Sequence, residues 1–177
     1  MKVAATLAVL SVGLAFGGPA SAQDWREDTE DKAIHVVVAP GAKEREPIAI
    51  PDARCLAVAA GPCAMVAEVL RRDMWLSFFF RVLPPRSYLA DQAVESLDHP
   101  GWRDWANIGA RFLIKVEVRG PAPYSAEMRL FNVTGEQAVS VAPQTFKGLS
   151  ERDLRMAAHR FANGVLEAIT GTRGVFD

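Results

Sequence analysis

Two segments in which apolar and polar side chains alternate, residues 112–119 and 124–130, constrain the fold of this chain more than any other feature. Successive side chains of a β-strand point to opposite faces of a sheet, so a period of two indicates a strand with one apolar face. The residues between the two segments, Gly-Pro-Ala-Pro at 120–123, are typical of a turn. The pattern therefore predicts two strands of a meander whose apolar faces need a covering layer.

A helix that can supply this layer begins directly after the strands. Ser150 and Asp153 have the spacing of a capping box, with Asp in place of Glu, and Gly171 is suited to end the helix. Between these ends, apolar residues recur at a spacing that forms one stripe along a helix. The stripe consists of Leu154, Ala157, Ala158, Phe161, Val165 and Ile169.

Shorter strands and helices are expected in the rest of the chain. The expected strands are at 47–51, 78–83 and 138–146, and the expected helical segments are at 62–75, 87–93 and 102–108. Pro143 cannot donate a hydrogen bond to a neighbouring strand, so the third of these strands should lie at a sheet edge or contain a bulge. We therefore predict an α+β fold, with a mixed sheet of about five strands and two main helices packed on one face.

The first 22 residues have the order of a secretory signal peptide. Lys2 precedes an apolar run that is too short for a membrane span of ~20 residues. Ala20-Ser21-Ala22 offers small side chains to a signal peptidase, so we expect cleavage after Ala22 and export of a chain that is not embedded in the membrane. An uncleaved anchor is the alternative. Residues 23–46 would form a flexible lead and a mobile strand, and residues 47–177 the folded domain.

The expected lead has two contrasting parts. Residues 23–32 contain five acidic residues, two basic residues and one apolar residue, Trp25, so they cannot bury enough surface to become ordered. An apolar run rich in β-branched residues follows and ends at Pro40-Gly41, which is typical of a turn. The run consists of Ala33, Ile34, His35, Val36, Val37, Val38 and Ala39.

Few residues offer catalytic or metal-binding chemistry. The net charge of −1 provides no basic field for nucleic acid. The three histidines, at positions 35, 99 and 159, lack the spacing of a helical metal pair, and the sequence contains no nucleophile-elbow, zinc-protease, phosphate-loop or dinucleotide motif. We therefore expect no catalytic residue, no metal and no cofactor. Asp98, His99 and Asp104, in one loop, leave a small enzyme as the least favoured alternative.

Two further pairs are candidates for structural roles. Cys55 and Cys63 are eight positions apart in a chain that we expect to be exported. A disulfide could tie the end of the first strand of the domain to the start of its first helix, and two buried free thiols are the alternative. Trp102 and Trp105 could face a ligand, but a pair with this spacing belongs more commonly to the core, where we expect it.

Several stretches resemble the amino-terminal domain of the TolB family, the periplasmic component of the Tol–Pal envelope system. Residues 34–38 and 45–50 are similar to the family's opening strand and to its R-P-I element with the apolar strand that follows. Residues 157–176 are similar to its closing helix and its T-G-x-[KR]-G-x-F ending. Residues 105–110 resemble its W-x-x-L-G-x-[DE] segment without the final acid. The resemblance covers about residues 33–176, and the acidic residues 23–32 and the two cysteines are additions to the family's pattern.

The resemblance implies a non-enzymatic periplasmic interaction domain that serves envelope integrity, cell division and protein or colicin import. In the family, the segment after the signal peptide binds the inner-membrane-anchored protein TolA, and residues 33–39 hold that place here. A full member continues into a β-propeller that contacts the lipoprotein Pal, whereas this sequence stops at Asp177. A contact with Pal is therefore not implied, and a separate propeller subunit is a candidate partner. An activator of an envelope synthase with a similar small fold is the alternative.

Overall fold

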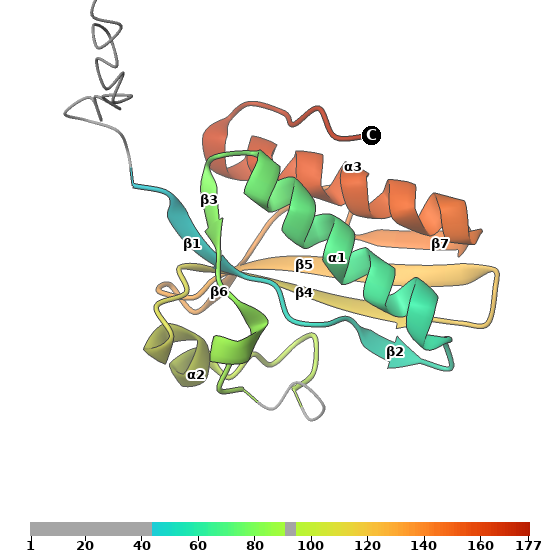
Figure 1. The fold of residues 1–177 in the computed structure, drawn as a ribbon, viewed down its shortest axis with the longest axis horizontal. Helices are drawn as coiled ribbons and strands as arrows, with labels where there is room; N and C mark the ends of the chain where they lie inside the picture. The colour runs from blue at the N-terminus through green and yellow to red at the C-terminus, as the bar shows by residue number, and fades with distance from the viewer. Residues whose placement is uncertain (1–43, 91–94) are drawn as a thin grey trace, which may run out of the picture. The chain divides into compact units, whose positions relative to one another are not determined.

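The two alternating segments form the centre of a mixed β-sheet in the computed structural model, which describes residues 44–90 and 95–177 (Figure 1). Strand β4 spans Phe112–Arg119 and β5 spans Tyr124–Asn132, and they pair antiparallel with Ile114 opposite Leu130. Both strands were predicted from the period-two alternation, and both are confirmed. The apolar side chains of the pattern, such as those of Ile114 and Met128, are fully buried.

Five shorter strands flank this central pair. Strands β1 (Glu46–Ala49) and β2 (Arg54–Leu56) follow one another along the edge of β4 that β5 does not occupy, and both are parallel to β4. Strand β3 (Phe80–Val82) pairs with the edge of β1 that faces away from β4. Strands β6 (Gln137–Val139) and β7 (Thr145–Leu149) lie along the other edge of β5 and are antiparallel to it. In the part of the chain that the structure describes, seven strands therefore fill five positions across the sheet, which confirms the predicted mixed sheet.

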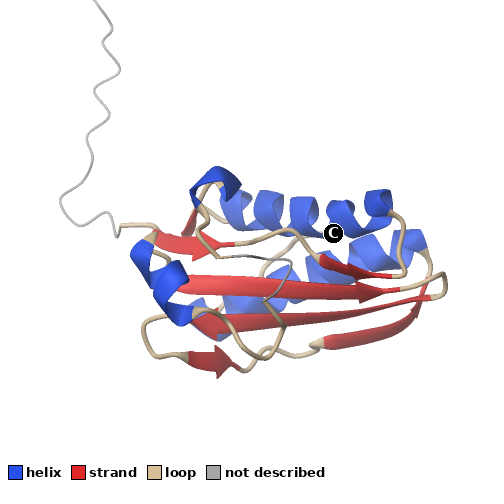
Figure 2. Ribbon diagram, turned by 90° about the horizontal axis from the view of Figure 1, so that it is seen from below, coloured by secondary structure: helices blue, strands red, loops and turns tan. Residues whose placement is uncertain are grey.

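Two long helices cover one face of the sheet (Figures 1 and 2). Helix α1 spans Ala60–Leu76 and α3 spans Glu151–Thr170. Their apolar stripes meet the inward side chains of β4 and β5 in a buried cluster that includes Leu70, Phe161 and Val165. The predicted packing of two main helices on one face is confirmed.

The ends of α3 follow the predicted signals. The Ser150 hydroxyl accepts a hydrogen bond from the backbone N–H of Asp153 at 3.2 Å, and the Asp153 carboxylate accepts one from the backbone N–H of Ser150 at 3.3 Å. Gly171 ends the helix with a φ of 75°, a conformation that glycine adopts without the strain of a Cβ. Both ends are therefore determined by local sequence.

The segment between β3 and β4 covers part of the opposite face of the sheet. It contains a 3-10 turn, η1 (Pro85–Ser87), and a short helix, α2 (Trp102–Asn107). Trp105 of α2 is fully buried in a second cluster with Leu113 and Phe131, while Trp102 is partly buried against the same cluster. This cluster confirms that the two tryptophans belong to the core. Figure 2 shows α2 at one end of the sheet.

The structure corrects several expected boundaries. The strand expected at 138–146 is two strands, because the residues from Ser140 to Gln144 leave the sheet between β6 and β7. Both pieces lie at the sheet edge, as Pro143 requires. The helix expected from Pro62 begins at Ala60. Of the helical turns expected at 87–93, the structure describes residues 87–90, where a 3-10 turn ends at Ser87; residues 91–93 lie outside the described residues. No helix within the described ranges is long and apolar enough to cross a membrane.

Candidate functional site

The predicted partner-binding run, residues 33–39, lies outside the described residues, as do the signal peptide and the acidic residues 23–32. The structure does describe where this part of the chain joins the domain. Arg45 precedes β1, and its guanidinium carbon lies 5.2 Å from the centre of the Phe78 ring. Glu46, the first residue of β1, forms an ion pair of 2.7 Å with Arg111. The chain therefore enters the domain between β3 and the start of β4.

The two cysteines lie where a short strand meets the first helix. Cys55 is in β2 opposite Val118 of β4, and Cys63 is in the first turn of α1. The structure joins them in a disulfide, with Cα atoms 6.0 Å apart. Because β2 has only three residues, this bond and the pairing with β4 hold it in place. Its role is structural.

The loop cluster of Asp98, His99 and Asp104 does not form a site. Asp98 is ion-paired with Arg129 of β5, and Asp104 lies in the first turn of α2, where a negative charge is favourable. Within residues 44–90 and 95–177, no group of three His, Cys, Asp or Glu side chains is placed to hold a metal ion. Nothing in this geometry favours the small-enzyme alternative.

A buried acid–histidine pair lies elsewhere, between the two long helices. Nδ1 of His159 in α3 lies 2.7 Å from Oδ2 of Asp73 in α1, and both side chains are largely buried. Burial raises the pKa of Asp73 above its ordinary value, while the hydrogen bond and charge of His159 oppose the shift. Single-sequence reasoning missed this pair because its members are 86 positions apart.

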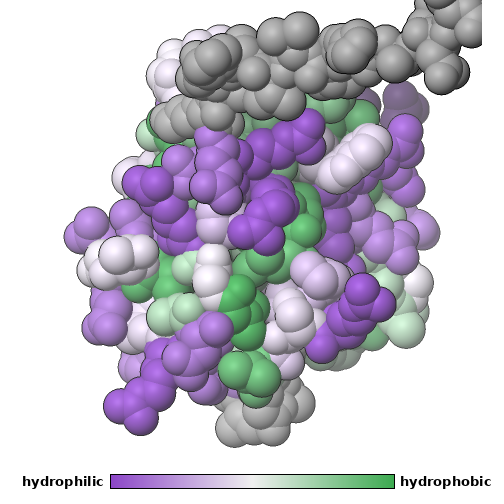
Figure 3. Space-filling model, turned by 60° about the vertical axis from the view of Figure 1, so that its left-hand side comes forward, coloured by the Kyte–Doolittle hydropathy of each residue, from purple (hydrophilic) through white to green (hydrophobic). Residues whose placement is uncertain are grey.

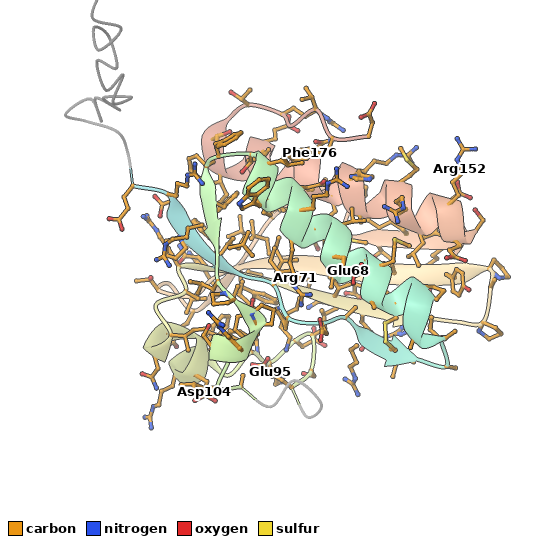
Figure 4. All side chains as sticks on the ribbon, in the orientation of Figure 1. Glu68, Arg71, Glu95, Asp104, Arg152 and Phe176 are labelled. Carbon is orange, nitrogen blue, oxygen red and sulfur yellow. A yellow bond between two sulfur atoms is a disulfide. The ribbon has the colours of Figure 1, made fainter. Side chains whose placement is uncertain are left out.

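The same pair lines a groove of about 330 Å³. Its other walls come from both helices and from the end of the chain, which folds back along α3. The side-chain amide of Asn163 donates to the backbone carbonyl of Phe176 at 2.8 Å and accepts from its backbone N–H at 2.9 Å. Figure 4 shows Phe176 beside the two helices, and the groove has cationic walls from Arg72 and Arg155.

A second buried charged group fastens the α2 segment to the sheet. The Glu95 carboxylate accepts hydrogen bonds from Nζ of Lys115 at 2.8 Å and from Nε1 of Trp105 at 2.9 Å. Burial lowers the pKa of Lys115, and the hydrogen bond and charge of Glu95 oppose that shift. These contacts tie the segment between β3 and β4 to the polar face of β4. They are structural.

The carboxyl end of α1 exposes large apolar side chains. Trp75 is 57% exposed and Phe78 is 65% exposed, and their ring centres lie 6.5 Å apart. Leu76 is also exposed and lines the groove described above. We call Trp75, Leu76 and Phe78 the aromatic corner. The sequence pattern predicts Trp75 at the end of a helix and gives no sign that its side chain faces solvent.

Comparisons with known proteins cover most of the chain. A family model described as the TolB amino-terminal domain matches residues 34–139. The chain belongs to this family. The resemblance inferred from the sequence motifs is thereby confirmed, and the match begins inside the run 33–39. The acidic residues 23–32 lie outside it.

Curated relatives extend the TolB likeness to most of the chain. The Tol-Pal system protein TolB of Anaeromyxobacter dehalogenans is 37% identical over 159 residues, covering 81% of this chain and 36% of the relative. That of Syntrophotalea carbinolica is 29% identical, covering 81% of this chain and 34% of the relative. The chain therefore spans about a third of these relatives' length. Crystalline TolB from Acinetobacter baumannii shares the fold, with a TM-score of 0.50 at 14% identity over 73% of this chain and 29% of that chain.

Proposed function

We propose that this chain is a non-enzymatic, periplasmic interaction domain of a Tol–Pal envelope system. The observation that carries the proposal is its membership of the TolB amino-terminal domain family, together with relatives named as Tol-Pal system proteins. The signal-peptide pattern of residues 1–22 supports export. The proposed role covers envelope integrity, cell division and import of proteins that exploit the system.

Within this function, residues 33–39 bind a TolA-like protein anchored in the inner membrane. The family match includes 34–39, and the run is rich in β-branched residues. An extended segment can add a strand to the edge of a partner's sheet, where main-chain hydrogen bonds give affinity and alternate side chains give specificity. Ile34, Val36 and Val38 would share one face of that strand, and His35 and Val37 the other.

The domain itself can remain folded while this segment binds. Among the described residues, those that form the buried clusters on both faces of the sheet begin at Ile48. Pro40-Gly41 separates the run from β1. Engaging the run therefore requires local opening at most, which costs far less free energy than global unfolding.

The test is deletion of residues 23–40 from the exported protein, with binding to a TolA carboxy-terminal domain measured by calorimetry. We expect the deletion to preserve the circular dichroism spectrum and cooperative unfolding and to abolish binding. Two matched variants test the two faces of the strand. Replacing Ile34, Val36 and Val38 by serine removes the apolar side chains of one face, and replacing His35 and Val37 by serine removes the side chains of the other. We expect the face that packs on the partner to be the more sensitive of the two.

Two results would contradict the proposal. If the deletion unfolds the domain, the run is a member of its own sheet and is not free to bind. If the deleted protein binds TolA as tightly as the intact protein, the partner surface lies elsewhere.

A further inference from the structure

Four exposed apolar side chains lie where α1 ends and the carboxyl-terminal tail passes. Three of them form the aromatic corner, Trp75, Leu76 and Phe78, and the fourth is Val175 of the tail, which lines the same groove as Leu76. The exposed fraction of Val175 is 90%. We call these four residues the apolar end surface. Monomeric domains rarely leave a contiguous apolar surface of this kind in solvent, so it indicates a binding partner.

The backbone holds Phe78 outward. Its φ of 56° lies in the left-handed region, which is strained for a residue with a Cβ. The Ser77 hydroxyl accepts a hydrogen bond from the backbone N–H of Phe79 at 3.3 Å, and the guanidinium carbon of Arg45 lies over the Phe78 ring. The chain therefore turns from α1 to β3 with this ring fixed on the outside.

The tail holds Val175 outward in a similar way. Phe176, the next residue, packs against the core, and its backbone forms two hydrogen bonds with the side chain of Asn163. A Cβ at Gly174 would lie 2.5 Å from Oδ1 of Asn163 and 2.9 Å from Cδ1 of Leu166, so the tail lies directly on α3. Val175 is held between these two anchors with its side chain in solvent. The apolar end surface therefore needs no rearrangement before it binds.

The area of this surface is suited to one side of a dimer interface. An interface of standard size buries about 800 Å² on each partner, and somewhat more than half of this area is apolar. With exposed fractions of 57% for Trp75, 38% for Leu76 and 65% for Phe78, the four side chains together expose on the order of 400 Å². A second copy of the same surface would therefore complete most of the apolar centre that such an interface requires.

The charges around the surface are of both signs. Four exposed arginines lie at its edge or along the two grooves beside it, and four exposed acids accompany them, two of which precede an arginine by one helical turn. The basic residues are Arg45, Arg72, Arg81 and Arg155, and the acidic residues are Glu44, Glu68, Glu151 and Asp177. Figure 3 shows apolar areas enclosed by hydrophilic side chains on the face that it presents. A strongly charged partner would meet charges of its own sign along half of this edge.

We propose that the apolar end surface joins two copies of this chain in a homodimer with two-fold symmetry. In a two-fold contact a patch faces itself, so the apolar centre packs on its own copy, and basic side chains of one edge can meet acidic side chains of the other. The aromatic corner lies nearest to the axis, and its rings anchor the interface. Dimerisation involves neither TolA nor residues 33–39, so it does not depend on the proposed function.

Sedimentation velocity of the exported protein tests the proposal. Between about 1 and 100 µM we expect the sedimentation coefficient to rise from that of a monomer to that of a dimer. The double variant Trp75→Ser with Phe78→Ser should raise the dissociation constant by more than about tenfold. Leu89→Ser is the matched control, because Leu89 is 63% exposed and lies in the segment that covers the opposite face of the sheet. It should leave the dissociation constant unchanged.

A mixture of two charged variants tests the two-fold symmetry. A residue close to the axis meets its own copy, so Phe78→Lys and Phe78→Glu should each be monomeric alone. An equimolar mixture should form a dimer that contains one copy of each, because opposite charges then meet. Circular dichroism and cooperative urea unfolding of both variants should match those of the wild type, since Phe78 is in neither buried cluster.

Three results would overturn the proposal. The first is an exported protein that stays monomeric over the whole concentration range, and sedimentation of that monomer with phosphatidylglycerol vesicles would assign the surface to a membrane. The second is an equal loss of association in Leu89→Ser, which would make the contact non-specific. The third is a dimer that forms only in a chain starting at Lys43, which would show that residues before Lys43 cover the surface.

Discussion

At the scale of residues, buried pairs of ionisable side chains join elements of the domain. Asp73 and His159 connect α1 to α3, and Glu95 and Lys115 connect the α2 segment to β4. Removing a charge from water is costly, so each group depends on its partner, and loss of one partner leaves the other charge buried and unpaired. The free energy at stake is therefore larger than the net contribution of the intact pair.

The first prediction concerns His159. His159→Ala should lower the free energy of unfolding at pH 7 by about 3 kcal/mol, because it leaves the Asp73 carboxylate buried without its hydrogen-bond partner. Adding Asp73→Asn to His159→Ala should restore part of the loss, since a neutral amide is cheaper to bury than a carboxylate. Urea denaturation of the wild type, the single variant and the double variant measures both effects.

The pH dependence of this recovery has a definite sign. Burial raises the pKa of Asp73 in the folded state above its unfolded value, and loss of His159 removes interactions that oppose the increase. The folded single variant therefore takes up a proton at a higher pH than the unfolded chain, so acidification relieves its penalty. The advantage of the double variant over the single one should shrink as the pH falls from 7 towards 4.5. A constant advantage over this range would contradict the prediction.

At the scale of elements, the shortest strands need support beyond their own residues. Strand β2 has three residues, two of them exposed, and forms no part of the fully buried core. Its attachments are the pairing with β4 and the disulfide from Cys55 to Cys63. Loss of the disulfide should loosen the junction of β2 and α1 and leave the central sheet intact.

The second prediction is that the disulfide is closed in the exported protein and stabilises it. Replacing both Cys55 and Cys63 by Ser should lower the free energy of unfolding by about 2–3 kcal/mol, the value expected when a loop of this length is opened in the unfolded chain. Reducing agent should destabilise the wild type by a similar amount and leave the double variant unchanged. Thiol titration of the unreduced, denatured wild type should find no free thiol, and finding two would contradict the prediction.

Local patterns predicted the elements whose ends and faces are determined by nearby residues. Strands β4 and β5 followed from alternation, and α3 followed from Ser150, Asp153 and Gly171. The same approach was wrong for 138–146. Val139 of β6 lies opposite Leu130 of β5, and Phe146 of β7 lies opposite Ala126 of β5. The chain advances seven residues from Val139 to Phe146, while the paired positions on β5 are only four residues apart. The extra residues between β6 and β7 therefore leave the sheet. That mismatch depends on how β6 and β7 pair with β5, and the sequence of a single strand does not reveal this pairing.

Local sequence patterns also do not predict that polar residues of β4 are buried. Lys115 and Glu117 alternate with the apolar residues of β4, and both are nearly fully buried. Glu95, from the segment between β3 and β4, covers Lys115, and Arg54 and Arg119 pair with Glu117. The same limit on prediction from local sequence applies to the candidate functional residues. The family resemblance indicated the run 33–39, whereas the Asp73–His159 pair and the aromatic corner became visible only in three dimensions.

At the scale of the whole molecule, the folded unit is defined by two covered faces. One cluster lies beneath α1 and α3, and the other lies beneath α2 and the loop that contains it. The carboxyl-terminal tail is held by Asn163 and adds Phe176 to the first cluster. With both faces of the central strands covered from within residues 46–176, the domain has the core that independent folding requires.

The last prediction is that a chain starting at Lys43 folds by itself, with a free energy of unfolding within about 1 kcal/mol of that of the exported protein. Among the described residues, those of both buried clusters begin at Ile48, so the truncation removes none of them. The dependence of unfolding on urea should also be unchanged, because that slope follows the surface exposed on unfolding. The same truncation should lose binding to TolA, so one variant separates the folded unit from the binding segment. A smaller slope, or loss of cooperative unfolding, would show that residues before Lys43 belong to the core.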